Sequence, residues 1–465
     1  MNVLIVGAGP AGSTAAYYLA KAGISVTVLE KTSFPREKVC GDGLTPRAVR
    51  EIQKLGLPHL ETDGWRRNKG LRLIAGGRTI ELPWPEVSDF PQYGLIRTRL
   101  GFDEELARHA QAAGAQILER HSVTEALRSE DGRVTGVRAA ILDESGRKTG
   151  QTRDFSADVV LAADGNSTRT AVSLGIQKRD DRPLGVAVRT YFTSPRTDDD
   201  WMEGWLELPG RDGKLLPGYG WVFGVGDGTS NVGLGILNSS KDFGKLDYKQ
   251  VLREWTAGMP PEWGFNPENQ VGEIRGAALP MGFNRTPHYS PGLLLLGDAG
   301  GMVSPFNGEG ISYAMESARF AAEFIIDASS RSAPLSASLS ASLSASRRWG
   351  VSDVDARLAG YADYVRGQWG SHFTLGRAFA ALIGKPAVMK VALRTGMPVP
   401  VLMRFVVRLL ANLTDPAAKG FEDRVIRVLE SLVPATSNQG PSSTHGTSHS
   451  SSNSADSATK VRVNP

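Results

Sequence analysis

The single cysteine of this 465-residue chain lies in the segment KVCGDGLTPRAV, residues 38–49, where Gly-Asp-Gly follows it directly. A free thiol has a pKa near 8.5, so Cys40 is expected to be protonated at neutral pH and able to give up a proton. Asp42 is a second candidate proton donor. Because glycine lets another group approach the main chain closely, we expect a flat ligand beside Cys40 and Gly41. The alternative is that Cys40 only fills space, as buried cysteines commonly do.

A glycine pattern at the N-terminus predicts a dinucleotide site. Gly7, Gly9 and Gly12 form G-x-G-x-x-G between an apolar strand and an Ala-rich helix, and Glu30 ends the next strand. In this pattern the first glycine makes the turn, the second admits a pyrophosphate and the third lets helix and strand approach. Glu30 is expected to bind an adenosine ribose. The further contacts expected here are Pro10, Ala11 and Lys31.

A second glycine-rich turn follows a strand in LLLLGDAGGMVSPFNGEGI, residues 293–311. A helix that starts at this turn would present partial positive charge and free N–H groups to an anionic reduced flavin. The segment resembles the group of FAD proteins that includes aromatic hydroxylases and geranylgeranyl reductases. The resemblance implies FAD as the cofactor, with Asp298 on its ribityl chain. The other contacts that it implies are Gly297, Pro305, Gly308, Gly310 and Ile311.

Two more segments resemble the same group. LAADGNSTRTA is similar to its Asp-Gly segment, which implies that Asp164 and Gly165 contact the cofactor. RLGFDEEL is similar to its Arg-x-x-Phe-Asp segment, which implies that Arg99 approaches the cofactor. The alternative for Arg99 is an ordinary surface helix start.

Within this group, the chain resembles the geranylgeranyl reductase family over about residues 1–430. The resemblance rests on FPREKVCGDGLTPRAV, LPGYGWVFGVGDGTSNVGLG and GDAGGMVSPFNGEGI. The second segment is similar to the family's Tyr-x-Trp-x-Phe-Pro signature, with Tyr219, Trp221 and Phe223 matching and Gly224 in place of proline. Alternation along a strand puts the three aromatic residues on one face. The resemblance implies an apolar wall for a prenyl chain, and the alternative is that they pack as core.

The Cys40 segment and LPGYGW together look most like the corresponding segments of the family's actinobacterial menaquinone reductases. Those enzymes saturate one double bond of the isoprenoid side chain. The resemblance implies an FAD-dependent reductase, with menaquinone as first choice and NAD(P)H or another reductant as electron donor. An isolated alkene is not electrophilic, so the hypothesis is that an acid protonates it while reduced flavin supplies a hydride. Faces of Tyr219 and Trp221 would ease developing positive charge.

Three alternatives remain open. The first is reduction of geranylgeranyl diphosphate or a geranylgeranyl lipid, because a binding tunnel for the prenyl chain would select the shape of that chain more than its distant headgroup. The second is an aromatic hydroxylase. Against it, hydroxylases usually carry a histidine after Gly-Asp-Ala, whereas this chain has Gly300, Gly301 and Met302 there. The third is a flavin-binding protein that only stores prenyl lipid.

The predicted fold is α/β, with a Rossmann-type FAD-binding domain around a parallel sheet, a substrate domain with an antiparallel sheet, and C-terminal helices. The length favours more than one domain. The predicted divisions are 1–63, 95–178 and 272–330 for the FAD-binding domain, 64–94 and 179–271 for the substrate domain, 331–347 for a low-complexity insert, 348–435 for the helical region and 436–465 for a disordered tail.

Composition limits partners and location. The balance of 53 Lys+Arg against 49 Asp+Glu gives only +4, too little to indicate nucleic acid. One cysteine excludes an internal disulfide and a cysteine-based metal cluster, and no metal is expected. The chain begins MNVLIVGAG without a charged leader, and no apolar run approaches a bilayer span of about 20 residues. A cytoplasmic protein is therefore expected.

The C-terminal region predicts contact with the inner face of the cell membrane. Residues 364–414 contain no acid, and Arg404 and Arg408 share one helical face in VLMRFVVRLLANL. Basic amphipathic helices bind anionic lipid surfaces. The alternative is a packed helix with two solvated arginines. The basic residues of this region are Arg366, Arg377, Lys385, Lys390, Arg394, Arg404 and Arg408.

Overall fold

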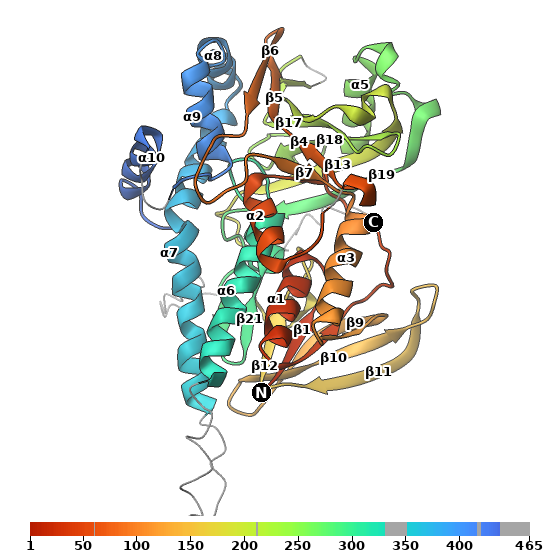
Figure 1. Ribbon diagram of the computed structural model, residues 1–465, viewed down its shortest axis with the longest axis vertical. Coiled ribbons are helices and arrows are strands. Elements are labelled where there is room, and N and C mark those ends of the chain that lie inside the picture. The colour runs from red at the N-terminus through yellow and green to blue at the C-terminus, as the bar shows by residue number, and fades with distance from the viewer. Residues whose placement is uncertain (60, 211–212, 331–350, 416–419, 438–465) are drawn as a thin grey trace, which may run out of the picture.

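A computed structural model describes residues 1–59, 61–210, 213–330, 351–415 and 420–437 (Figure 1). Its first sheet has parallel strands except for one antiparallel edge pair, β20–β21. These strands are short and apolar, and most of their side chains are fully buried, as in a sheet covered on both faces. In sheet order they are β20 (Tyr289–Ser290), β21 (Leu293–Leu295), β12 (Val159–Ala162), β1 (Asn2–Val6), β2 (Ser25–Leu29) and β8 (Gln116–Leu118).

Helices α1 (Pro10–Lys21), α3 (Arg99–Ala112) and α6 (Ile311–Ser330) pack on this sheet (Figure 1). Small buried residues line the contact between α1 and α6, so the two helices approach each other closely and bring their first turns to the same edge of the sheet. These residues are Ala15, Ala16, Ala318, Ala321 and Ala322.

On the remaining side of the sheet lies a three-stranded antiparallel meander. Its strands are β9 (His121–Arg128), β10 (Val134–Leu142) and β11 (Lys148–Ser156). Val123, Val137 and Phe155 pack in one core with Leu4 and Val160 of the parallel sheet. The sequence did not indicate this meander, which lies inside the stretch expected to be α/β.

The second large sheet has seven strands and is antiparallel except where β14 pairs with β5 in parallel. α5 (Tyr248–Ala257) covers one face with Leu252 and Trp255. The expected boundary at residue 272 falls inside the first strand of this sheet. In order the strands are β19 (Gln270–Pro280), β13 (Leu184–Thr193), β18 (Thr229–Leu237), β17 (Gly218–Gly224), β14 (Trp201–Trp205), β5 (Gly70–Ala75) and β6 (Arg78–Pro83).

A small sheet joins the Cys40 segment to these two layers. Its strands are β3 (Gly43–Leu44), β7 (Gly94–Ile96) and β4 (Arg66–Asn68), and a two-stranded ribbon of β15 (Leu208–Pro209) and β16 (Leu215–Leu216) lies elsewhere. Helix α2 (Pro46–Leu55) follows directly, with proline in its first turn and Gly56 in the left-handed conformation at its end. The short α4 (Arg169–Ser173) follows β12.

The C-terminal region consists of α7 (Val351–Ile383), α8 (Pro386–Gly396), α9 (Pro400–Leu410) and α10 (Phe421–Ser431). α7 runs beside α6 (Figure 1) and buries a stripe at helical spacing. The stripe consists of Leu358, Tyr361, Val365, Trp369 and Phe373. Met403 and Val407 of α9 pack in a core with Leu73 and Leu82 of the second sheet.

The predicted α/β class, with parallel and antiparallel sheets and C-terminal helices, is confirmed. The expected insert at 331–347 lies outside the described residues, as does most of the expected tail. Thr436, at the start of that tail, is buried and its N–H donates to the carbonyl of Gly370. None of the described helices is both long and apolar enough to cross a bilayer.

Candidate active site

The N-terminal glycines form a close-packed turn. Gly7 has φ +93°, and a Cβ placed there would lie 2.6 Å from the carbonyl oxygen of Ala163. A Cβ at Gly12 would overlap the carbonyl oxygen of Gly7. No side chain caps the start of α1, where Gly9 precedes Pro10 and Ala11. The turn therefore leaves backbone N–H groups at a helix start, which suits a pyrophosphate.

Glu30 lies beside this turn. Its Oε2 accepts a hydrogen bond from the N–H of Ala8 at 2.9 Å, and its Oε1 accepts one from the hydroxyl of Thr32 at 2.8 Å. Arg36, which the motif reasoning missed, lies 3.5 Å from the same carboxylate. The side chain of Lys31 is exposed.

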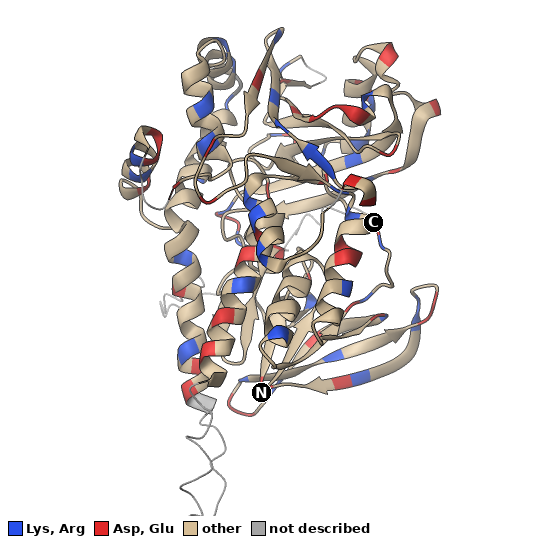
Figure 2. Cartoon of the chain, in the orientation of Figure 1, with Lys and Arg blue, Asp and Glu red and all other residues tan. Residues whose placement is uncertain are grey.

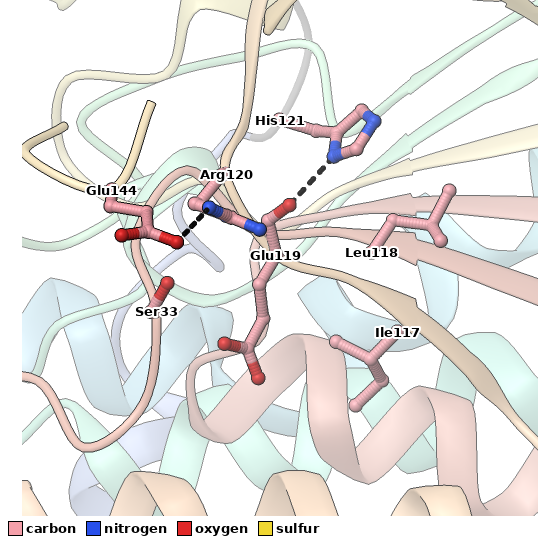
Figure 3. Close-up of a pocket in the computed structure, with 7 residues that line it drawn as sticks. All are labelled: Ser33, Ile117, Leu118, Glu119, Arg120, His121 and Glu144. Carbon is pink, nitrogen blue, oxygen red and sulfur yellow. Dashed lines mark hydrogen bonds and ion pairs between the residues drawn. The ribbon is translucent and has the colours of Figure 1, made fainter. Parts of the chain in front are cut away.

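A cavity of about 510 Å³ opens next to Glu30 (Figure 3). The main chain of Glu30 donates to Leu118 and accepts from His121, which places these residues side by side. The cavity wall is polar on one side, where Arg120 pairs with Glu144 at 3.9 Å. No spacing in the sequence marked these residues, because they come from three separate parts of the chain: the segment after β2, the end of β8 with the start of β9, and the turn after β10. The lining consists of Ser33, Ile117, Leu118, Glu119, Arg120, His121 and Glu144.

Two carboxyl groups face the space between the sheet and α6. Asp164 is partly exposed and Thr170 donates to its Oδ2 at 3.1 Å, whereas its Oδ1 is buried and has no partner among the described residues. Asp298 is partly exposed and follows the turn at Gly297. Its Oδ1 would lie 3.3 Å from a Cβ at Gly310. An unpartnered buried oxygen and a carboxylate at a helix start fit the hydroxyl and amide groups of a bound flavin nucleotide.

Several cations surround Asp298. Burial raises the pKa of Asp298, and the charges of Lys38, Arg99 and Lys178 oppose that rise. Lys38 is itself buried enough that its pKa falls below the ordinary lysine value. Lys38 was not singled out from the sequence, although it stands two residues before Cys40.

Arg99 is held rigidly. Its guanidinium donates to both oxygens of Asp103, at 2.6 and 2.8 Å, and Arg36 pairs with the same carboxylate at 2.9 Å. Arg99 is therefore a fixed buried cation, and the alternative of an ordinary surface position does not describe it. Its charge also reaches Cys40.

Cys40 is partly exposed in the described structure. Burial raises the pKa of its thiol, and Arg99 opposes the rise without reversing it. The thiol is therefore protonated at neutral pH.

The glycines around Cys40 lie against side chains of the second large sheet. A Cβ at Gly41 would lie 3.2 Å from the ring of Phe223 and 3.3 Å from Nε1 of Trp221. A Cβ at Gly43 would overlap the methyl group of Met202 on β14 and lie 3.1 Å from the Phe223 ring. The bare backbone thus lets side chains of β14 and β17 approach. The flat ligand expected beside Cys40 and Gly41 stays a prediction.

Asp42 is fully buried and has φ +65°, in the left-handed region. Its carboxylate accepts hydrogen bonds from the hydroxyl of Tyr191 at 2.5 Å, from Nδ2 of Asn231 at 2.7 Å and from the N–H of Arg99 at 3.1 Å. Burial raises the pKa of Asp42 to about 6, although these donors and the nearby Arg189 oppose the rise. Three donors hold the carboxylate in place, away from the surface where Cys40 is exposed.

The same network holds the main chain of the Cys40 segment. Nδ2 of Asn231 also donates to the carbonyl of Cys40 at 3.0 Å, and Nε of Arg189 donates to it at 3.3 Å. Nε1 of Trp221 donates to Oδ1 of Asn231 at 2.9 Å. Asn231 and Tyr191 were missed from the sequence. Asn231 could have been noticed as a polar residue within the apolar strand SNVGLGIL.

Tyr219, Trp221 and Phe223 lie on one face of β17, with ring centroids 6.2 and 6.5 Å apart in succession. The Tyr219 hydroxyl donates to the carbonyl of Asn307 at 2.6 Å, and burial raises the Tyr219 pKa to about 12. The aromatic wall is therefore fixed against the glycine-rich turn at Pro305–Ile311.

Glu309 is a further acid that the sequence reasoning did not single out. It is partly exposed and accepts a hydrogen bond from the hydroxyl of Thr45 at 2.6 Å. Burial raises its pKa. Its position inside the glycine-rich turn was the available signal.

Comparison with known proteins gives consistent results. The FAD-binding domain family matches residues 1–347. The menaquinone reductase of Mycobacterium tuberculosis is 34% identical over 426 residues, covering 92% of this chain and 94% of that protein. The digeranylgeranylglycerophospholipid reductase of Methanothrix thermoacetophila is 29% identical over 334 residues, covering 71% of this chain and 78% of that protein.

Among solved structures, a geranylgeranyl bacteriochlorophyll reductase-like protein from Thermoplasma acidophilum superimposes with a TM-score of 0.70. The match covers 93% of this chain and 99% of that one at 21% identity. At this identity the likeness shows a common fold.

Proposed function

This chain belongs to the FAD-binding domain family and is an FAD-dependent oxidoreductase, and we propose that it saturates a carbon–carbon double bond in the isoprenoid side chain of menaquinone. The observation that carries the proposal is the protonated Cys40 thiol, whose neighbour Gly41 lies against Trp221 and Phe223 of the aromatic wall. The likeness to the mycobacterial menaquinone reductase over nearly the whole chain supports the choice of substrate.

The residues present fit FAD. Bound and reduced FAD would supply a hydride equivalent. We assign NAD(P)H or another external reductant as the source of its electrons. Gly7, Gly9 and Gly12 would admit its pyrophosphate, and Glu30 would bind its adenosine ribose. Asp164 and Asp298 would accept hydrogen bonds from its remaining polar groups. The glycine-rich turn through Gly310 would bring the flavin ring to the backbone N–H groups at the start of α6.

We assign proton donation to Cys40 and positioning to Asp42. A buried carboxylate that already accepts three hydrogen bonds stabilises the shape of its segment, and moving its proton outward would require breaking those bonds. Cys40 keeps its proton at neutral pH and has an exposed side, so we assign it the transfer of a proton to an alkene carbon. The electron-rich faces of Tyr219 and Trp221 would stabilise the positive charge that forms on the neighbouring carbon.

We also propose that α8 and α9 contact the inner face of the cell membrane, from which the substrate would enter. Their outer surface exposes apolar residues among basic ones that have no ion-pair partner in the described part of the chain, and Figure 2 shows basic positions on both helices. Apolar and basic residues together bind anionic lipid. The apolar members are Val391, Val399, Val401 and Leu402, and the basic members are Lys385, Lys390, Arg394 and Arg404.

Arg408 does not belong to this surface. It pairs with Asp423 at 2.8 Å and with Glu422 at 3.4 Å, both on α10. The expectation that Arg404 and Arg408 face lipid together is therefore wrong for Arg408, because acids beyond Asp415 fold back onto it.

The test uses FAD-loaded protein, reduced anaerobically with light and mixed with menaquinone in lipid vesicles. The expected product is menaquinone heavier by two hydrogen atoms, measured by mass spectrometry. Reduction of geranylgeranyl diphosphate or a geranylgeranyl lipid in place of menaquinone would indicate the second substrate class. Hydroxylation with oxygen consumption would indicate a hydroxylase, and binding without any turnover would indicate a lipid-storage protein.

A further inference from the structure

A cluster of arginines lies where the segment before β13 meets α7. Arg179 and Arg182 both pair with Asp181, each at 2.8 Å. The charge of Arg377 on α7 acts on Arg182, and Asp181 acts on both arginines. Two guanidinium groups thus pair with one carboxylate that also acts on a third, and that carboxylate is itself more than half exposed to water.

The arginine side chains are more buried than the single carboxylate of Asp181 can compensate. Arg182 is only 7% exposed, and its Nε is buried without a hydrogen-bond partner among the described residues. Nε of Arg377 is also buried and has no hydrogen-bond partner among the described residues. Burial together with the charges of Arg377 and Arg179 lowers the pKa of Arg182 to about 10, although Asp181 opposes the fall. Burying like charges with unpaired donors is unfavourable, and an added anion would relieve it.

The cluster adjoins the proposed substrate site through a short apolar path. A Cβ at Gly282 would lie 3.4 Å from Cδ of Arg377 and 3.8 Å from Cγ of Pro305. A Cβ at Gly308 would lie 3.8 Å from the methyl group of Met281 and 3.9 Å from the hydroxyl of Tyr219. Arg377 therefore lies at one end of an apolar run that reaches the aromatic wall at the other.

We propose that Arg182 and Arg377 form a binding site for a phosphate group, which is carried either by a prenyl diphosphate or by an anionic phospholipid. Guanidinium groups bind phosphate oxygens through paired N–H donors, and two arginines from different elements can hold one group from two sides. The site is separate from the residues assigned to FAD, so its occupant is a second ligand of the loaded protein.

The test measures binding to the FAD-loaded protein by isothermal titration calorimetry, with inorganic pyrophosphate as one probe and monomeric dihexanoyl phosphatidylglycerol as the other. Arg377→Gln and Arg182→Gln are each expected to weaken binding of the preferred probe by roughly tenfold, since a charged hydrogen bond to phosphate is lost. Arg366→Gln is the matched control, because Arg366 is an exposed arginine of α7 about 16 Å along the helix. Binding in the control should equal that of the unchanged protein.

Two additional measurements keep the result interpretable. Asp181→Asn should strengthen binding several-fold, since it removes the carboxylate that competes with the anion. Arg377→Gln should raise the melting temperature without anion, since it removes repulsion with Arg182, which also shows that this variant folds. Preference for pyrophosphate indicates a prenyl diphosphate, and preference for the lipid indicates a membrane headgroup. Failure of both probes to bind, or equal binding in all variants, would overturn the proposal whatever the enzyme does with menaquinone.

Discussion

The Cys40 segment and the outer surface of α8 and α9 are both assigned to substrate handling, but they are built in opposite ways. Around Cys40, polar groups on four separate elements bind one another over distances of 2.5 to 3.3 Å. On α8 and α9, exposed valines and leucines alternate with basic side chains that have no described partner. The first region depends on individual contacts, whereas the second depends on the sum of many similar residues.

The difference predicts how each region tolerates change. A single substitution near Cys40 leaves a buried donor or acceptor unpaired, which costs about 1–3 kcal/mol. A single substitution on the α8–α9 surface removes one of several additive contributions. Both kinds of residue occur on the same helix, because Arg408 lies on α9 and yet forms a specific ion pair with Asp423.

The largest effect is expected from Gly12→Ala. The added Cβ would overlap the carbonyl oxygen of Gly7, so α1 and β1 would have to separate and the turn for the pyrophosphate would be lost. We expect no flavin absorbance in the purified protein and no reductase activity. Gly367→Ala is the control, since a Cβ there meets no described atom within 4 Å. Normal flavin content in Gly12→Ala would refute the assignment of this turn.

Cys40→Ala should lower turnover by at least about 100-fold, the usual minimum loss when a general acid is removed. Bound flavin should keep its absorbance and its rate of photoreduction, because the cofactor contacts proposed above lie elsewhere. Single-turnover oxidation of the reduced flavin by menaquinone measures the effect. An unchanged rate would remove Cys40 from catalysis and leave Glu309 as the next acid to test.

Asp42→Asn should change the pH dependence of stability. Its pKa rises from an ordinary 3.8 to about 6 on folding, so the native state favours the protonated acid. The stabilisation is complete below about pH 4 and is lost as pH rises through 6, which amounts to about 3 kcal/mol at about 1.4 kcal/mol per pH unit. The uncharged variant should therefore gain about 3 kcal/mol relative to the unchanged protein between pH 4 and pH 7. Urea unfolding at both pH values measures this difference, and parallel behaviour of the two proteins would contradict it.

The smallest effect is expected on the α8–α9 surface. Arg404→Gln should weaken binding to phosphatidylglycerol vesicles about fivefold, since one basic residue near an anionic surface contributes about 1 kcal/mol. Arg408→Gln should leave vesicle binding unchanged and lower stability, because its partners Glu422 and Asp423 lose their cation. Vesicle flotation and thermal unfolding of both variants measure the two effects. Equal flotation of Arg404→Gln and the unchanged protein would argue against a lipid-facing α9.

Most of the fold could be read from local pattern. The strand–turn–helix at the N-terminus and the strand at 159–162 appear where alternation and glycine spacing put them, because buried parallel strands and tight turns restrict residue type strongly. The meander at 121–156 was missed, since its outer strand carries mainly polar residues and leaves no apolar period to detect. The predicted domain boundary at residue 272 falls inside β19, because the membership of this strand in the second sheet depends on its pairing with the distant β13.

The sequence by itself determined which residues could hold a dinucleotide and which could donate a proton, because those properties follow from residue type and short spacing. The preference for Cys40 over Asp42 as the proposed proton donor depends on the tertiary structure, since β13 and β18 bring Tyr191 and Asn231 onto Asp42 from about 150 and 190 residues away. The same is true of Arg182 and Arg377, which interact only because the fold brings α7 near the segment that precedes β13. Burial and hydrogen-bond partners are properties of the packed chain, and no local pattern contains them.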